Sequence, residues 1–245
     1  MRHAPYPLIL AALAALSCSA AEEPVPEAPE DRSFTEEPRR PPPGSPDVVQ
    51  MVVVGTSLTA GMGLPDPVPQ SWAGRLQWMA DSAGLNVQVT NAGVSGDTSA
   101  GGLRRLAWLL EDRPADVVVL ELGANDGLRG LDLPAMEANL REMVRLSRDA
   151  NPAVAVVLAG MEAPPNLGES YTEGFREVFA RVASEPGVRM IPFLLDGVAG
   201  VPELNQADGI HPTPEGHRRM AETAWPVLEP VMREAASRRA RREGS

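Results

Sequence analysis

The sequence predicts a single α/β domain over residues 48–232, with a five-stranded parallel sheet between two layers of helices. Two observations support this prediction. Short apolar runs rich in β-branched residues alternate along the chain with longer segments whose apolar residues recur every three or four positions. Strand–helix–strand units of this kind join parallel strands through right-handed crossovers, which place helices on both faces of the sheet.

The first half of the domain contains three of the expected strands. Residues 48–54 form a near-continuous apolar run, which is typical of a strand buried on both faces. A helix is expected over 71–84, a short strand over 87–90 and a second helix over 98–113. Residues 115–122, with the sequence ADVVVLEL, show the strongest strand pattern of the chain.

The second half continues the alternation and completes a three-layer α/β/α (flavodoxin-like) fold. Helices are expected over 133–150 and 171–184, and strands over 153–159 and 188–193. A closing helix is expected over 212–232, with Pro226 and Pro230 disturbing its end.

The N-terminal residues 1–18 are predicted to be a signal peptide. A basic start precedes an apolar run ending at Leu16, which is shorter than the ~20 residues that span a bilayer. The ALSC motif resembles a bacterial lipobox, in which Cys18 becomes the lipidated first residue of the mature protein. Ordinary cleavage near Ala20 or Ala21 is the alternative. The lipoprotein is favoured because the only Cys of the chain occupies the required position.

The segments that flank the domain are expected to lie outside its core. Residues 19–47 are rich in Pro and acidic residues with little to bury, so they are predicted to form a disordered tether. Export to the periplasm follows from either cleavage site, the lipid on Cys18 would hold the protein on a membrane, and Ser19 is compatible with outer-membrane sorting. The basic segment 233–245 is expected to be a frayed, solvated helix end rather than a binding element.

Composition excludes several classes of chemistry. All 22 basic residues are Arg, so the amine that P-loop, Schiff-base and Ser–Lys mechanisms require is missing. Three His and one Cys are too few for Cys-rich zinc sites, disulfide frameworks or His-x-x-x-His metal helices. A formal net charge of −11 and an aromatic content of 4% argue against a nucleic-acid partner.

Polar residues follow the predicted strands at their carboxyl ends, where parallel α/β sheets bind ligands. Ser57 lies in the glycine-rich turn 55–61 after the first strand, and a helix N-cap is the alternative role for such a Ser. The turn does not match a P-loop, a dinucleotide-binding loop or a Gly-x-Ser-x-Gly elbow. Gly93, after the second strand, could present its backbone N–H to a ligand or form a turn that needs a positive φ.

Further candidates follow the third strand and precede the closing helix. Asn125 supplies an amide, for which an Asx-turn is the alternative role. Asp208 precedes His211 by three residues, a spacing that lets the carboxylate bond Nδ1 and leaves Nε2 free as a base. His217 is the rival base, but its position inside the closing helix favours a solvated His. Together these residues supply a nucleophile, a base, an orienting acid and oxyanion donors at one rim of the sheet.

Four segments resemble, in order, the sequence blocks of the SGNH, or GDSL, hydrolases. They are the turn 55–61, Gly93, the Gly-x-Asn-Asp segment 123–126 and Asp208-x-x-His211. The longer stretches PADVVVLELGANDGLRG and DGIHPTPEGH are similar to those of exported arylesterases, thioesterases and lysophospholipases.

The resemblance implies a serine carboxyl-ester hydrolase that needs no cofactor and no metal. It makes Ser57 the nucleophile, His211 the general base and Asp208 the residue that orients His211. The implied oxyanion hole consists of the N–H of Ser57, the N–H of Gly93 and the side-chain amide of Asn125. The expected substrates are small aryl or alkyl esters, acyl thioesters or lysophospholipids.

The residues around these blocks raise three further points. Thr56 stands where the family usually has Asp, which leaves the support of the Ser57 turn unexplained. Asp126 is expected to hold its loop by accepting hydrogen bonds from backbone N–H groups. The loop 127–133, where relatives have a mobile substrate loop, is expected to cover the acyl group, with Leu128 facing the substrate and Leu131 either facing it or packing on the following helix.

Two other functions remain open at this stage. A deacetylase of cell-wall or other polysaccharides would use the same fold, although 4% aromatic residues offers few platforms for stacking sugars. A non-catalytic envelope lipoprotein on a decayed hydrolase scaffold is the other possibility. The presence of all the residues implied as catalytic argues against it.

Overall fold

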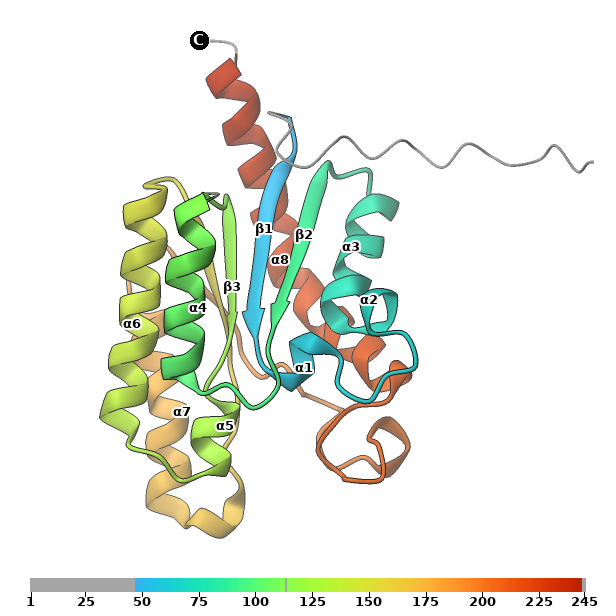
Figure 1. Ribbon diagram of the computed structural model, residues 1–245, viewed down its shortest axis with the longest axis vertical. Coiled ribbons are helices and arrows are strands. Elements are labelled where there is room, and N and C mark those ends of the chain that lie inside the picture. The colour runs from blue at the N-terminus through green and yellow to red at the C-terminus, as the bar shows by residue number, and fades with distance from the viewer. Residues whose placement is uncertain (1–46, 113, 244–245) are drawn as a thin grey trace, which may run out of the picture. The chain divides into compact units, whose positions relative to one another are not determined.

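The computed structural model describes residues 47–112 and 114–243 (Figure 1). The predicted signal peptide, the lipidation site Cys18 and all of the tether except Asp47 lie outside the described residues. Within the described part of the chain, no helix combines the length and the apolar character that crossing a membrane requires.

In the described part of the chain, five strands form one sheet in which every neighbouring pair is parallel, as predicted. The order β2-β1-β3-β4-β5 means that the chain first steps from β1 to one edge and then proceeds in the opposite direction. The loops after β1 and β3 therefore diverge, which opens a crevice at their carboxyl ends. The strands are β1 (Val49–Gly55), β2 (Val87–Gly93), β3 (Val117–Glu121), β4 (Ala155–Ala159) and β5 (Val188–Ile191).

Helices cover both faces of the sheet and complete the three predicted layers (Figure 1). One layer consists of α3 (Trp72–Ser82) and α8 (Pro214–Glu243), which pack against each other. The other layer consists of α4 (Ser99–Asp112), α6 (Leu133–Ala150) and α7 (Glu169–Ala183). Because β3 lies between these layers, all five of its residues are buried.

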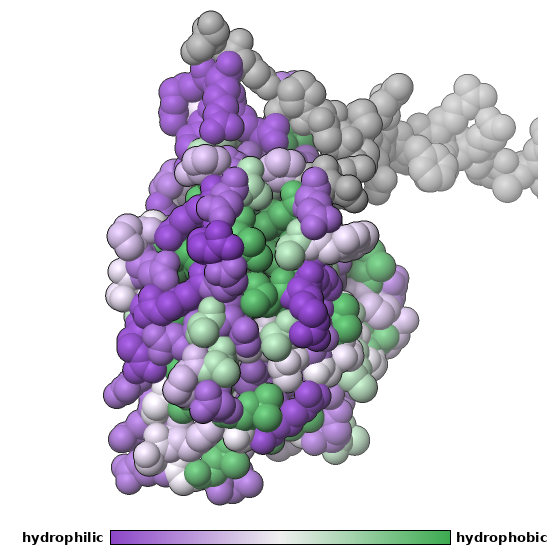
Figure 2. All heavy atoms as spheres, turned by 60° about the vertical axis from the view of Figure 1, so that its left-hand side comes forward, coloured by the Kyte–Doolittle hydropathy of each residue, from purple (hydrophilic) through white to green (hydrophobic). Residues whose placement is uncertain are grey.

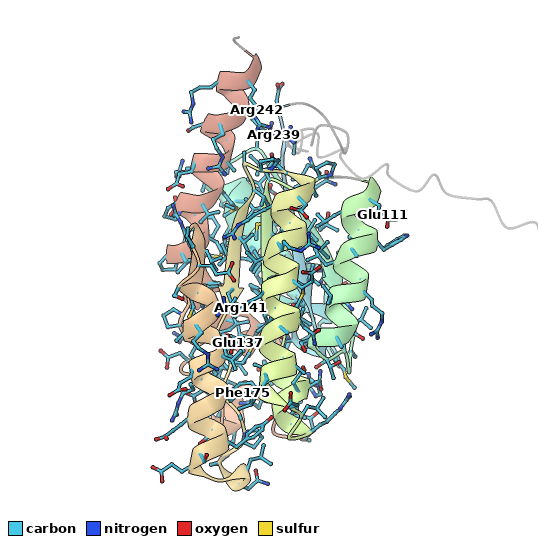
Figure 3. All side chains as sticks on the ribbon, turned by 90° about the vertical axis from the view of Figure 1, so that its left-hand side faces the viewer. Glu111, Glu137, Arg141, Phe175, Arg239 and Arg242 are labelled. Carbon is cyan, nitrogen blue, oxygen red and sulfur yellow. The ribbon has the colours of Figure 1, made fainter. Side chains whose placement is uncertain are left out.

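Ion pairs join α6 and α7 on the outside of the molecule. Glu137 of α6 accepts hydrogen bonds from Arg141 of the same helix, at 2.9 Å, and from Arg181 of α7, at 2.8 Å. Figure 3 shows Glu137 and Arg141 together on this outer side, and Figure 2 shows that hydrophilic side chains cover most of it. These groups are partly exposed, so solvent screens the pairs and each contributes little to stability.

The closing helix is longer than predicted. It continues past residue 232 to Glu243, so most of the expected tail is helical. Pro226 and Pro230 do not end it, and both lie exposed within the continuous helix. Ala235 is buried, and Arg239 donates to Asp116 at 2.7 Å, so residues beyond 232 pack on the domain.

The sequence pattern misses several elements of a single turn. A segment of three to five residues is too short to show a helical period. Two of these elements follow β1 and β3 directly and support candidate site residues. The missed elements are α1 (Ser57–Ala60), α2 (Pro67–Gln70), α5 (Ala124–Leu128) and the 3₁₀ turns Pro165–Leu167 and Pro202–Leu204.

Candidate active site

The segments that follow β1 and β3 and the segment that precedes α8 converge at the carboxyl edge of the sheet. Ser57, Asn125 and His211 line the same pocket, although His211 is far from the other two in sequence. These three residues were expected at one rim of the sheet, because each lies next to an element that begins or ends there.

Ser57, His211 and Asp208 form a continuous hydrogen-bonded series. Ser57 Oγ lies 2.9 Å from His211 Nε2, and His211 Nδ1 lies 2.6 Å from Asp208 Oδ2. The other carboxylate oxygen of Asp208 accepts the backbone N–H groups of Ile210 and His211, each at 3.0 Å. The hydrogen bond from the His211 ring, followed by these two backbone bonds, lowers the pKa of Asp208 to about 2. Asp208 is therefore an anion that accepts from Nδ1–H and leaves Nε2 to face Ser57.

Ser57 is the first residue of α1, and the cap position belongs to Thr56. Thr56 is buried and makes no side-chain bond to the helix, so neither residue acts as an N-cap through its hydroxyl group. The hydroxyl group of Ser57 instead faces His211. The alternative interpretation of Ser57 as a helix cap is therefore wrong.

The other two expected oxyanion donors already have hydrogen-bond partners. The N–H of Gly93 donates to Asn91 Oδ1 at 3.0 Å, and Asn125 Nδ2 donates to the backbone oxygen of Asp97 at 2.9 Å. Gly93 does not have a positive φ, so that interpretation of the glycine is wrong. Its lack of a side chain matters because a Cβ atom there would lie 2.2 Å from the backbone nitrogen of Ala60 in α1.

The pocket beside Ser57 is a mainly apolar cavity of about 630 Å³. Leu128, at the end of α5, lines it and is 49% exposed. Leu131 is not among the lining residues, and its backbone oxygen accepts a hydrogen bond from the Tyr171 hydroxyl at 2.8 Å. Further apolar lining comes from the segments after β4 and β5, namely Met161, Ala163, Pro164, Phe193 and Leu195.

His217 is buried rather than solvated as predicted. It is 1% exposed, and its Nδ1 accepts the backbone N–H of Trp72 at 3.2 Å. Burial, with smaller contributions from the charges of His211 and Arg75, lowers the pKa of His217 to about 4. The prediction failed because a single polar residue in a helix does not reveal which face of that helix packs on a neighbour, here α3.

Asp126 connects α5 to the first turn of α4 at this edge of the sheet. Its carboxylate accepts the backbone N–H of Ser99 at 2.8 Å and the Ser99 hydroxyl at 2.6 Å. The expectation that Asp126 accepts backbone N–H groups is thus confirmed. The bonds fix the first turn of α4 to α5, the helix that contains Asn125.

Two charged residues close to the Ser57 turn were not predicted from the sequence. Glu121, the last residue of β3, is fully buried and accepts hydrogen bonds from Thr56 and Thr59, on either side of Ser57. Arg105 of α4 donates to the backbone oxygen atoms of Gly55 and Ala92. A signal for Glu121 existed, because a single acid inside the strongest apolar run needs buried partners. No comparable signal marks Arg105 on a surface helix.

Family membership and named relatives, together with the fold, define an enzyme that hydrolyses ester bonds. Residues 53–219 match the GDSL-like Lipase/Acylhydrolase family. The chain belongs to this family, which confirms the resemblance seen in the sequence.

Named relatives and a solved structure agree with this assignment. The chain is 43% identical over 183 residues to "Esterase TesA" of Pseudomonas aeruginosa, a match that covers 74% of this chain and 89% of the relative. It is 33% identical over 184 residues to "Thioesterase 1/protease 1/lysophospholipase L1" of Escherichia coli strain K12, covering 74% of this chain and 84% of that one. A solved structure of TesA superposes with a TM-score of 0.70 at 42% identity, covering 74% of this chain and 99% of that chain.

Proposed function

We propose that the protein is a serine hydrolase of carboxylic esters and acyl thioesters that works through an acyl-enzyme. Ser57 is the nucleophile, His211 the general base and Asp208 the residue that orients His211. The observation that supports this proposal is the series of contacts from Ser57 Oγ to His211 Nε2, at 2.9 Å, and from His211 Nδ1 to Asp208, at 2.6 Å.

The reaction proceeds in two half-reactions. Ser57 Oγ attacks the acyl carbonyl while its proton passes to His211 Nε2, and the imidazolium ion is stabilised by the Asp208 carboxylate. When the tetrahedral intermediate collapses, the bond to the leaving group breaks and His211 returns the proton to the departing alcohol or thiol. Water then loses a proton to His211 and attacks the acyl-enzyme. The bond between the acyl carbon and Ser57 Oγ breaks, His211 returns the proton to Oγ, and the carboxylic acid is released.

Negative charge on the carbonyl oxygen requires hydrogen-bond donors. The donors in this proposal are the N–H of Ser57, the N–H of Gly93 and the amide of Asn125. Asn125 has a second N–H besides the one that bonds Asp97, whereas the N–H of Gly93 must be shared with Asn91 or released from it. Removing one such donor typically lowers kcat by about 10²–10³-fold.

The pocket supports a substrate with an apolar acyl chain. Its volume of about 630 Å³ and its lining of Leu, Met, Pro and Phe side chains would remove several methylene groups from water. The printed names of the relatives, esterase and thioesterase/lysophospholipase, agree with esters, thioesters and lysolipids as the substrate class. Leu128 is proposed to contact the acyl chain, and Leu131 to shape the loop without lining the pocket.

Labelling and a hydrolysis panel test this function. A fluorophosphonate probe should label Ser57 in the wild-type protein and leave the Ser57→Ala variant unlabelled. The panel combines chromogenic esters and acyl-CoA thioesters of two to ten carbons with an acetylated glycan. Acetate release from the glycan without turnover of the longer acyl esters would replace this proposal with a polysaccharide deacetylase. Labelling that persists in Ser57→Ala would remove the assignment of the nucleophile.

A further inference from the structure

One peptide unit beside the nucleophile is hydrogen-bonded on both sides by charged groups, a buried carboxyl group and a partly buried guanidinium. The backbone oxygen of Gly55 accepts from Arg105 Nη2 at 2.7 Å. The N–H of the same peptide, on Thr56, donates to Glu121 Oε2 at 2.8 Å. The Gly55–Thr56 peptide thus lies between a guanidinium and a carboxyl group, and the next residue along the chain is Ser57.

Glu121 extends this contact to both sides of Ser57. Besides the Thr56 N–H, it accepts the Thr59 hydroxyl at 2.7 Å, the Thr56 hydroxyl at 3.0 Å and the Thr59 N–H at 3.2 Å. Its side chain is fully buried, and this burial raises the pKa of Glu121, while the hydrogen bonds from the two threonines oppose the rise. Four donors around one carboxyl group leave the turn with little freedom to move.

The turn is also packed too closely for a side chain at Gly55. A Cβ atom there would lie 2.0 Å from Thr59 Oγ1 and 2.5 Å from Glu121 Oε2. Thr59 Oγ1 in turn accepts the indole N–H of Trp72 at 3.1 Å. The turn that presents Ser57 is therefore built around the Glu121 carboxyl group.

Arg105 links this turn to the other two proposed oxyanion donors. Its Nε donates to the backbone oxygen of Ala92, the residue before Gly93, at 3.0 Å. Its Nη1 pairs with the carboxylate of Asp97, whose backbone oxygen accepts the Asn125 amide at 2.9 Å. The guanidinium thus contacts the segments of Ser57 and Gly93 directly and is linked to Asn125 through Asp97.

We infer that Arg105 and Glu121 are positioning residues that hold the three oxyanion-hole segments in a single arrangement around the Gly55–Thr56 peptide. The inference rests on the proposed function, because it concerns the geometry of the same hydrolytic site. It also accounts for Thr56, which replaces the usual Asp of the family. Its hydroxyl group donates to Glu121, whereas an Asp would place a second carboxyl group against a buried one.

Variants of Glu121 test whether hydrogen bonding holds the turn. In Glu121→Gln the amide oxygen can accept the bonds now made to Oε2, and the NH₂ group can donate to a rotated Thr56 hydroxyl. This variant should keep kcat within about threefold, whereas Glu121→Ala should lose about 10²-fold or more in kcat with little change in KM, as for the loss of an oxyanion donor. Val119→Ala is the matched control, since Val119 lies on the same strand and face and is equally buried. It should lower Tm without this loss of kcat.

Two outcomes would overturn the role of Glu121. If Glu121→Ala lowers kcat no more than Val119→Ala at a similar Tm, the residue is merely structural. If Glu121→Gln is as impaired as Glu121→Ala, the hydrogen bonds are not what matters.

Variants of Arg105 test whether the two residues act on the same peptide. Arg105→Lys keeps the charge but cannot reach three acceptors at once, so its kcat should fall nearly as far as that of Arg105→Met. The losses of Glu121→Ala and Arg105→Met in log kcat should be far from additive in the double variant. Additive losses, or a lysine variant with wild-type kcat, would contradict the inference.

Hydrogen exchange of the Ser57–Ala60 amides separates this inference from the proposed function. Exchange there should accelerate in Glu121→Ala and Arg105→Met but not in Val119→Ala, whether or not the enzyme turns over. Unchanged exchange in the first two variants overturns the positioning role. A wild-type protein that neither hydrolyses acyl esters nor reacts with a fluorophosphonate overturns the proposed function instead.

Discussion

We predict that the buried His217 lowers the free energy of unfolding at acid pH. Its side chain is 1% exposed and its pKa lies at about 4, against 6.5 for the free side chain. Because the folded-state pKa is depressed, the unfolded chain takes up a proton on this His first as the pH falls below 6.5. Stability is therefore unaffected by His217 above pH 7 and decreases between pH 6.5 and 4. At pH 4.5, the titration of His217 lowers the free energy of unfolding by about 2.5 kcal/mol relative to neutral pH, because each unit of pKa shift corresponds to about 1.4 kcal/mol.

The variant His217→Gln isolates this effect from other titrating groups. Gln can still accept the Trp72 N–H, which would otherwise remain buried and unpaired at a cost of about 1–3 kcal/mol, but it does not titrate. We expect urea unfolding at pH 7.5 and 4.5 to show a decrease for the wild type that exceeds the decrease for His217→Gln by about 2.5 kcal/mol. Equal decreases in the two proteins would refute the buried, neutral state of His217. At neutral pH, His217→Ala should lower the free energy of unfolding by more than the removal of a solvent-exposed His would.

Three further predictions concern the site and the N-terminus. His211→Ala should lose orders of magnitude in kcat/KM toward soluble esters, whereas His217→Gln at pH 7.5 should keep most of it; the reverse ranking would make His217 the base. Leu128→Ala should lower kcat/KM more for hexanoyl and octanoyl esters than for acetyl esters, since each buried methylene contributes up to about 0.8 kcal/mol, and an equal loss at every chain length would show that Leu128 does not contact the acyl chain. In a bacterial host, Cys18→Ser should abolish membrane partition and the incorporation of labelled fatty acid, and unchanged partition would remove the proposed lipid anchor.

Local sequence patterns are enough to predict the layers of the fold and the residues at the carboxyl edge of the sheet. Runs such as Val49–Gly55 and Val117–Glu121 lie largely buried between the two helical layers, so they are mainly apolar, and their alternation with helical segments allows few arrangements other than a parallel sheet between helices. Ser57, Asn125 and His211 could be placed at one rim because each lies next to an element whose direction the parallel sheet fixes.

The surroundings of those residues depend on contacts between segments that lie far apart in the chain. The burial of His217 depends on α3 packing against α8, and the continuation of α8 past two prolines depends on contacts such as that between Arg239 and Asp116. The support of the Ser57 turn comes from Glu121 and Arg105, which are distant from it in sequence. Hydrogen bonds between distant segments leave no periodic pattern in either segment, because their partners are set by how the layers meet. The periodicity of a segment indicates which of its faces is apolar. It does not indicate which distant residues will form hydrogen bonds with a buried charged group, because folding brings those residues together.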